Sequence, residues 1–112
     1  MSNSLPVFAE AIKGRTLHRA IFDIVRKHVE HEKGVRFFLF GSEALGTSWR
    51  TSDVDIGLWG PKPISSKTIE NVRDDLERLA TLRTFDIVDF AHVSEPFRTE
   101  ALKSVIIPDE QD

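Results

Sequence analysis

One stretch, residues 53 to 59, alternates strictly between two kinds of side chain and constrains the fold more than any other part of the chain. Its three aliphatic residues share one face of a strand, because successive strand side chains point to opposite sides. Asp53 and Asp55 then project together from the other face, which they share with Gly57. Two carboxylates this close repel each other unless they lie in open solvent, beside basic groups or on a metal ion. Mg²⁺ prefers such paired hard oxygens, so the stretch predicts a strand with a candidate metal site on its polar face.

A glycine-serine pair, Gly41-Ser42, follows an apolar run over residues 35–40 that has the length and aromatic content of a buried strand. Gly41 has no Cβ, so its backbone can approach a ligand closely. The Ser42 hydroxyl and the first N–H groups of the following turn can point at phosphate oxygens. The pair therefore predicts a phosphate-binding turn at the end of this strand.

Ten residues separate Ser42 from Asp53, and the fuller pattern reads Gly-Ser-x-Ala-x-Gly, then Ser-Asp-x-Asp-Ile. This pattern resembles the signature of the polymerase-β-type nucleotidyltransferases, and in particular their small, single-domain minimal nucleotidyltransferase (MNT) branch. The resemblance covers roughly residues 35 to 90. It implies an enzyme that transfers a nucleoside monophosphate from an NTP, with ATP the expected nucleotide, to an acceptor hydroxyl and releases pyrophosphate. It assigns Gly41, Ser42 and Ser52 to nucleotide binding, and Asp53 and Asp55 to two Mg²⁺ ions.

A third carboxylate is expected on the strand predicted over residues 85–90, which contains Asp86 and Asp89. A carboxylate in an apolar strand costs free energy unless it is paired or bound to a metal. If Phe85 and Ile87 pack on the helices, Asp86 shares a face with the first two aspartates. The family resemblance likewise implies a third carboxylate on this strand. We therefore predict that Asp86 completes the metal triad and accepts the acceptor's proton, with Asp89 as the alternative.

Two residues depart from the family pattern, which tends to carry arginine around the alanine of the turn. Here Glu43 and Leu45 flank Ala44. Glu43 is expected to lower the positive charge near the phosphates, and Arg50 in the following loop is the residue that would compensate. Gly57 has two open interpretations, as space beside the metals or as a kink in the strand.

The remaining apolar patterns predict three longer helices. They are expected from Thr16 as N-cap to near Gly34, from Ser65 or Ser66 to about Leu82, and after Ser94, where Pro96 opens the last helix. The order of elements predicts an α/β (α+β) domain with helices on one face of a small mixed sheet of three or four strands. By resemblance this is a polymerase-β-like nucleotidyltransferase fold. The expected boundaries are an N-terminal extension over residues 1–14, the domain over 15–107 and an acidic tail over 108–112.

Composition limits the other functions. The 112 residues carry a net charge of −3, which argues against a dedicated nucleic-acid binder. The sequence has no cysteine and no apolar run near eighteen residues, so no membrane span is expected and a cytoplasmic location is the default.

The length fits one modest core and leaves no second domain to hold an acceptor. The resemblance therefore implies a partner protein that supplies the acceptor: a helical HEPN-type or nucleotidyltransferase-substrate-binding protein, encoded nearby, with this chain as the antitoxin half of the cassette. Whether the chain also forms homo- or hetero-oligomers is open. Two other functions are open as well: a nucleotide-binding antitoxin or regulatory subunit without turnover, and a structural domain whose carboxylates are simply solvated.

Overall fold

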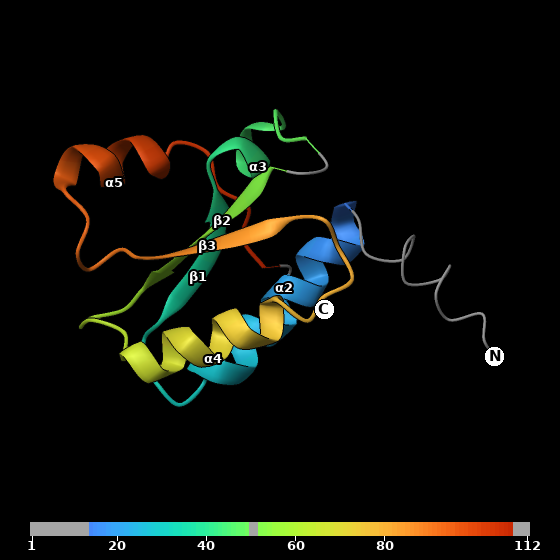
Figure 1. Cartoon of the computed structure of the whole chain (residues 1–112). Coiled ribbons are helices and arrows are strands. Elements are labelled where there is room, and N and C mark those ends of the chain that lie inside the picture. Colours follow the sequence, from blue (N-terminus) through green and yellow to red (C-terminus); the bar gives the residue numbers. More distant parts are fainter. Residues whose placement is uncertain (1–13, 50–51, 109–112) are drawn as a thin grey trace.

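The computed structural model describes residues 14–49 and 52–108 (Figure 1). The elements follow the order that the sequence predicts: α2 (Gly14–Val29), β1 (Arg36–Phe40), α3 (Ser42–Leu45), β2 (Asp53–Trp59), α4 (Ser66–Leu76), β3 (Thr84–Asp89) and α5 (Glu95–Ala101). The predicted extension and tail lie outside the described residues, except for Gly14 and Pro108. Within the described part, no helix is long and apolar enough to cross a membrane.

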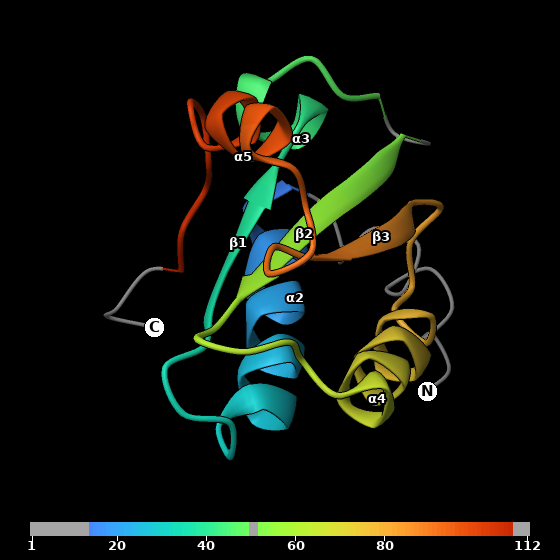
Figure 2. The ribbon, with the colours of Figure 1, turned by 90° about the vertical axis from the view of Figure 1, so that its left-hand side faces the viewer.

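The sheet has three strands in the order β1-β2-β3, with β2 antiparallel to β1 and parallel to β3 (Figure 2). This mixed sheet confirms the predicted fold class. A fourth segment extends it by a single bridge, in which the backbones of Leu39 and Ile106 exchange two hydrogen bonds of 2.9 Å. The C-terminal segment thereby covers part of the outer edge of β1, which would otherwise expose unpaired backbone groups.

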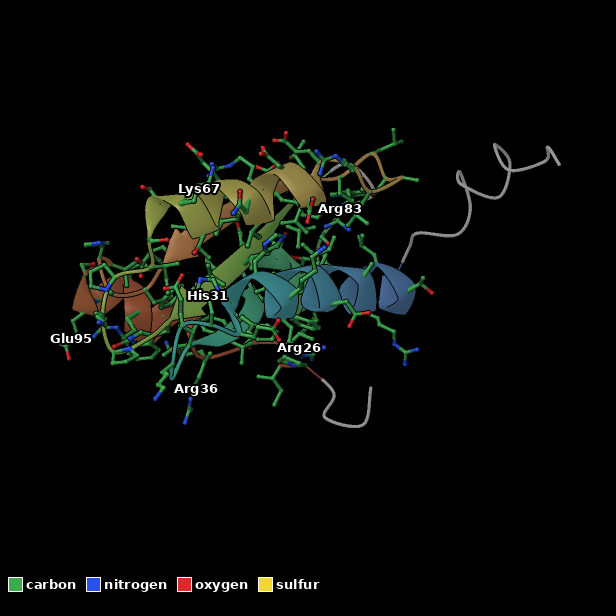
Figure 3. The ribbon with its side chains drawn as sticks, turned by 90° about the horizontal axis from the view of Figure 1, so that it is seen from below. Arg26, His31, Arg36, Lys67, Arg83 and Glu95 are labelled. Carbon is green, nitrogen blue, oxygen red and sulfur yellow. The ribbon has the colours of Figure 1, made fainter. Side chains whose placement is uncertain are left out.

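One face of the sheet is covered by α2 and α4, which lie side by side when the molecule is viewed from below (Figure 3). Both helices are amphipathic and turn their apolar sides to the strands. Ser65 caps α4 by accepting the backbone N–H of Thr68. The fully buried centre of this core consists of Leu17, Ile21, Val25, Leu39, Val54, Ile56, Leu58, Val72 and Leu76.

The opposite face of the sheet carries a smaller aromatic core, and α5 packs over it (Figure 1). The sequence predicts helices on one face of the sheet. Phe38, Phe40 and Phe90 form its buried centre, and their rings meet edge to face or tilted. Of the two interpretations left open for Gly57, space beside the metals is wrong. A Cβ on Gly57 would overlap the Phe38 ring and lie 2.9 Å from Phe90 Cε1, so this glycine makes room for aromatic packing.

Two predicted helix boundaries also shift. Thr16 lies inside α2 and is not its N-cap, because Gly14 and Arg15 are already helical. The second long helix ends at Leu76 rather than near Leu82, since the chain tightens there into turns in which the Arg78 N–H donates to the Asp75 carbonyl. Such i-to-i+3 bonds commonly close a helix end, and apolar spacing alone does not reveal them.

Candidate active site

The register of β2 and β3 places Asp55 directly beside Asp86. Asp55 is also the partner of Phe40 at the end of β1, so its side chain lies where all three strands meet. Phe85 and Ile87 pack against the helix-covered core, which confirms the register that separates Asp86 from Asp89. The structure therefore brings Asp55 and Asp86 together on the face away from α2 and α4.

Asp89 lies on the other side of β3 and has a structural task. Its carboxylate accepts the backbone N–H of Ile64 at 2.8 Å and that of Ala91 at 2.9 Å. These bonds tie the segment before α4 to the end of β3. Asp89 is thus occupied in holding two loops and is not directed to the face that carries Asp55.

The electrostatics of Asp55 differ from those of an ordinary surface carboxylate. Burial raises the pKa of Asp55, and the negative charges of Asp86 and Asp53 raise it further. Within residues 14–49 and 52–108, no hydrogen bond or ion pair reaches the carboxylate of Asp55 or Asp86. The local charge is therefore uncompensated by this part of the chain, a condition that a bound cation would relieve.

Asp53 differs from Asp55 and Asp86 because its carboxylate has a partner: it accepts a hydrogen bond from the hydroxyl of Thr84. Among the described residues, no three His, Cys, Asp or Glu side chains converge into a group that could hold a metal ion by itself. Of the predicted triad, the structure sets Asp55 and Asp86 side by side, while the Asp53 carboxylate is hydrogen-bonded to Thr84. The triad itself stays a prediction. This donor set still fits Mg²⁺, which is commonly held by one or two carboxylates together with substrate phosphates.

Gly41 joins the predicted phosphate turn to the carboxylates. Its backbone has φ 70° and ψ −147°, a conformation that glycine adopts readily and other residues rarely adopt. A Cβ at this position would overlap the Asp55 Oδ2 atom. The glycine therefore allows the turn to lie directly against the carboxylate, which the sequence could suggest only as a close approach to some ligand.

We expect Gly41→Ala to weaken NTP binding about tenfold, because either the turn or the Asp55 carboxylate has to move. Gly46→Ala is the matched control, since Gly46 has a similar φ of 75° but nothing within 4 Å of an added Cβ. Both variants should lose about 1–3 kcal/mol of unfolding free energy to backbone strain. Calorimetric titration with Mg-ATP and urea denaturation measure the two effects, and equal affinities in the two variants would contradict the role of Gly41.

The two serines predicted to bind nucleotide have different surroundings. Ser42 is partly exposed at the first position of α3, whose N-terminus has no side-chain cap. Ser52 closes the loop before β2: its hydroxyl accepts the Trp49 N–H at 2.8 Å, and its own N–H donates to the Trp49 carbonyl at 3.0 Å. Ser42 is thus the more available of the two for a phosphate oxygen.

Glu43 does not have the surroundings that the sequence suggested. Its side chain is only 8% exposed and accepts hydrogen bonds from Arg83 at 2.5 Å and Ser48 at 2.8 Å, with His18 Nε2 also at 2.5 Å. Burial alone would raise the pKa of Glu43, but these hydrogen bonds and the charge of Arg83 lower it to about 2. Glu43 therefore stays ionised, and its negative charge is paired with Arg83. Its effect on the charge at the phosphates stays a prediction. Arg50, named as the compensating residue, lies outside the described residues.

Sequence reasoning missed Arg83 and His18, which lie 40 and 25 residues from Glu43. The one available signal was an acidic residue in a turn where a basic one was expected. That signal does not identify the partners, since only the folded chain brings them together.

A small mixed sheet that holds a glycine-serine turn against paired aspartates defines a protein of the nucleotidyltransferase class. The sequence agrees: residues 23–112 match the family described as "Polymerase beta, Nucleotidyltransferase", and the chain belongs to this family. No curated protein matches the sequence.

Solved structures show the same fold at low sequence identity. A toxin-antitoxin complex with AMP-PNP has 20% identity and a TM-score of 0.59, covering 76% of this chain and 69% of that one. A tri-AMPylated HEPN toxin in complex with an MNT antitoxin, from Shewanella oneidensis, has 18% identity and a TM-score of 0.56, covering 83% and 71%. A mutant form of the toxin-antitoxin pair MntA-HpeT has 16% identity and a TM-score of 0.58, covering 82% and 70%.

Proposed function

We propose that this chain transfers AMP from ATP to a hydroxyl on a partner protein. The observation that carries the proposal is the junction of the three strands, where Gly41 lies against Asp55 and the register sets Asp86 beside it. This junction combines a turn that can hold phosphates with carboxylates that lack a counter-charge in the described structure. This one domain would therefore contribute both the phosphate-binding turn and the metal-binding carboxylates.

Each residue has a proposed task in the reaction. The Gly41 backbone and the Ser42 hydroxyl hold the triphosphate, with Ser52 supporting the loop beside it. Asp53, Asp55 and Asp86 would hold two Mg²⁺ ions, which supply charge neutralisation and lower the pKa of the attacking hydroxyl. The Thr84 hydroxyl is hydrogen-bonded to Oδ1 of Asp53, so the other carboxylate oxygen is the one we propose for the ion.

The proposed transfer is a single displacement. The acceptor oxygen forms a bond to the α-phosphorus, the bond from that phosphorus to the bridging oxygen breaks, and pyrophosphate leaves. Asp86 accepts the proton of the attacking hydroxyl. Most of the rate enhancement then comes from positioning and charge stabilisation, as in phosphoryl transfer generally.

Exposed apolar residues next to the phosphate turn support an acceptor on another protein. Leu45 is 64% exposed and Trp49 is 79% exposed, on α3 and the loop that follows it. Burial of such side chains is a common source of binding free energy at interfaces. We propose a helical HEPN-type partner encoded nearby, in keeping with the toxin-antitoxin complexes that share this fold.

The test is co-expression with the neighbouring gene product, followed by incubation of the complex with α-labelled ATP. We expect label on the partner in Mg²⁺. EDTA should abolish it, because the carboxylates and the triphosphate repel each other without the metal, and Asp53→Asn should abolish it because a metal ligand is lost. Asp75→Asn, a change on α4 far from the turn, is the control that should keep the label. A complex that binds Mg-ATP without labelling the partner would identify a nucleotide-binding regulatory subunit instead.

A further inference from the structure

The short helix α3, which carries Ser42, is not held by apolar packing. Its apolar residues are not buried: Leu45 is 64% exposed and Ala44 is partly exposed. Burial of apolar side chains is the usual means by which a helix is fixed in a domain, and a single turn of helix has little stability of its own. Something else must therefore determine where the phosphate turn lies relative to the strands.

Arg83 makes the connection. Its Nη2 donates to Glu43 Oε1 at 2.5 Å, and its Nε donates to the Ser52 carbonyl at 2.7 Å. Arg83, labelled in Figure 3, is also the residue directly before Thr84, where β3 begins. One guanidinium thus joins α3, the start of β2 and the start of β3, which are the three segments that carry the candidate site.

The other side of Glu43 is attached as well. His18 Nε2 lies 2.5 Å from Glu43 Oε2, which links α3 to α2, and Ser48 donates to Glu43 Oε1 from the loop. The side chains of Glu43 and Arg83 are 8% and 10% exposed, so their contact is shielded from water. A charge-assisted hydrogen bond in such surroundings holds its geometry better than a surface ion pair.

We infer that Glu43 and Arg83 are positioning residues, which hold the Gly41-Ser42 turn at a fixed distance from Asp55 and Asp86. The effect on the position of α3 follows from the structure alone. The effect on nucleotide binding and catalysis rests on the proposed function. Glu43 thereby has a role opposite to the one expected from its sequence: the acidic residue holds the phosphate site in place instead of weakening it.

The experiment compares Glu43→Ala, Glu43→Gln and Arg83→Lys with a control, Asp75→Ala. Asp75 joins α4 to α2 through its contact of 2.7 Å with His28 Nε2, and it also contacts Arg78, just after α4, at 2.5 Å. No residue of the candidate site takes part in these contacts. The first readout needs no nucleotide: hydrogen exchange of the Leu45, Gly46 and Thr47 amides, whose bonds form α3 and its end. The second readout is KM and kcat for the labelling of the partner with Mg-ATP.

We expect Glu43→Ala to speed exchange of these three amides and to raise KM for Mg-ATP about tenfold with a smaller change in kcat. Glu43→Gln keeps the length of the side chain and one acceptor oxygen, so it should restore part of both properties. Arg83→Lys keeps the charge but loses the two-pronged contact, so it should resemble Glu43→Ala and remain informative if that variant fails to fold. Asp75→Ala should lower stability without changing KM.

Two results would overturn the inference. The first is unchanged exchange of the α3 amides in both Glu43→Ala and Arg83→Lys. The second is an equal rise of KM in Asp75→Ala, which would mean that general loss of stability explains the effect. If exchange rises as expected but the unaltered protein binds no Mg-ATP, then the proposed function is wrong and the role in nucleotide positioning is lost with it.

Discussion

Asp86→Asn is expected to reduce turnover by on the order of 10² or more, the scale of a positioned general base, while Mg-ATP affinity changes much less. Asp86 lies beside Asp55, and within residues 14–49 and 52–108 no hydrogen bond or ion pair reaches its carboxylate, which is therefore available to metal and acceptor. Asparagine keeps the shape of the side chain and cannot take a proton at neutral pH. Single-turnover transfer to the partner measures the loss directly.

Asp89→Asn should show the reverse pattern. Its carboxylate accepts the N–H groups of Ile64 and Ala91, and an amide can offer only one oxygen to these two donors. We expect a loss of about 1–3 kcal/mol in unfolding free energy and near-normal turnover. If Asp89→Asn removed turnover and Asp86→Asn did not, the roles of the two residues would be reversed.

The parts of the fold that the sequence predicted well are those that local periodicity determines. β2 begins and ends where the alternation of residues 53–59 begins and ends. The choice of Asp86 over Asp89 followed from the same reasoning, since only one register lets Phe85 and Ile87 face the helices. Ser94 caps its helix, and Ser65 is the one of the two candidates, Ser65 and Ser66, that caps α4. Both could be proposed from sequence because an N-cap accepts a bond from a backbone N–H only three residues away.

The parts that the sequence did not predict depend on contacts between distant residues. Gly57 is explained only by Phe38 and Phe90, which come from two other segments and meet over it. The sequence predicted that Glu43 places a negative charge beside the phosphates, whereas in the structure its carboxylate contacts His18 and Arg83. The position of Asp53 depends likewise on the Thr84 hydroxyl. In each case the residue type was visible in the sequence, and the partner that decides its role was not.

Asp55→Asn is expected to make the protein more stable and nearly unable to bind its nucleotide. The pKa of Asp55 is raised in the folded chain by burial and by Asp86 and Asp53. A carboxyl whose folded pKa is raised binds its proton more tightly in the native state, so the unaltered protein loses stability as pH rises through that pKa. At neutral pH the ionised group therefore destabilises the fold, and the neutral amide removes this cost.

The same substitution removes the charge that a metal-bound triphosphate needs. Loss of one partner of a partly buried charge contact is commonly worth about 2–5 kcal/mol, so we expect Mg-ATP affinity to fall on the order of 10²-fold. Urea denaturation at neutral and acidic pH should show a higher midpoint for Asp55→Asn at neutral pH, with the difference disappearing below the ordinary pKa of aspartate. Calorimetric titration measures the affinity.

Asp75→Asn is expected to have the opposite effect on stability from Asp55→Asn. The pKa of Asp75 is lowered by its hydrogen bond to His28, despite some desolvation, and by the charges of Lys27, His28 and Arg78. Its stabilisation is present above the ordinary pKa of aspartate and is lost as pH falls, so the amide should lower the urea midpoint at neutral pH and leave Mg-ATP binding intact. If Asp55→Asn instead lost stability as Asp75→Asn does, Asp55 would be a structural carboxylate with a stabilising partner, and the strained pair on which the proposed metal site depends would not exist.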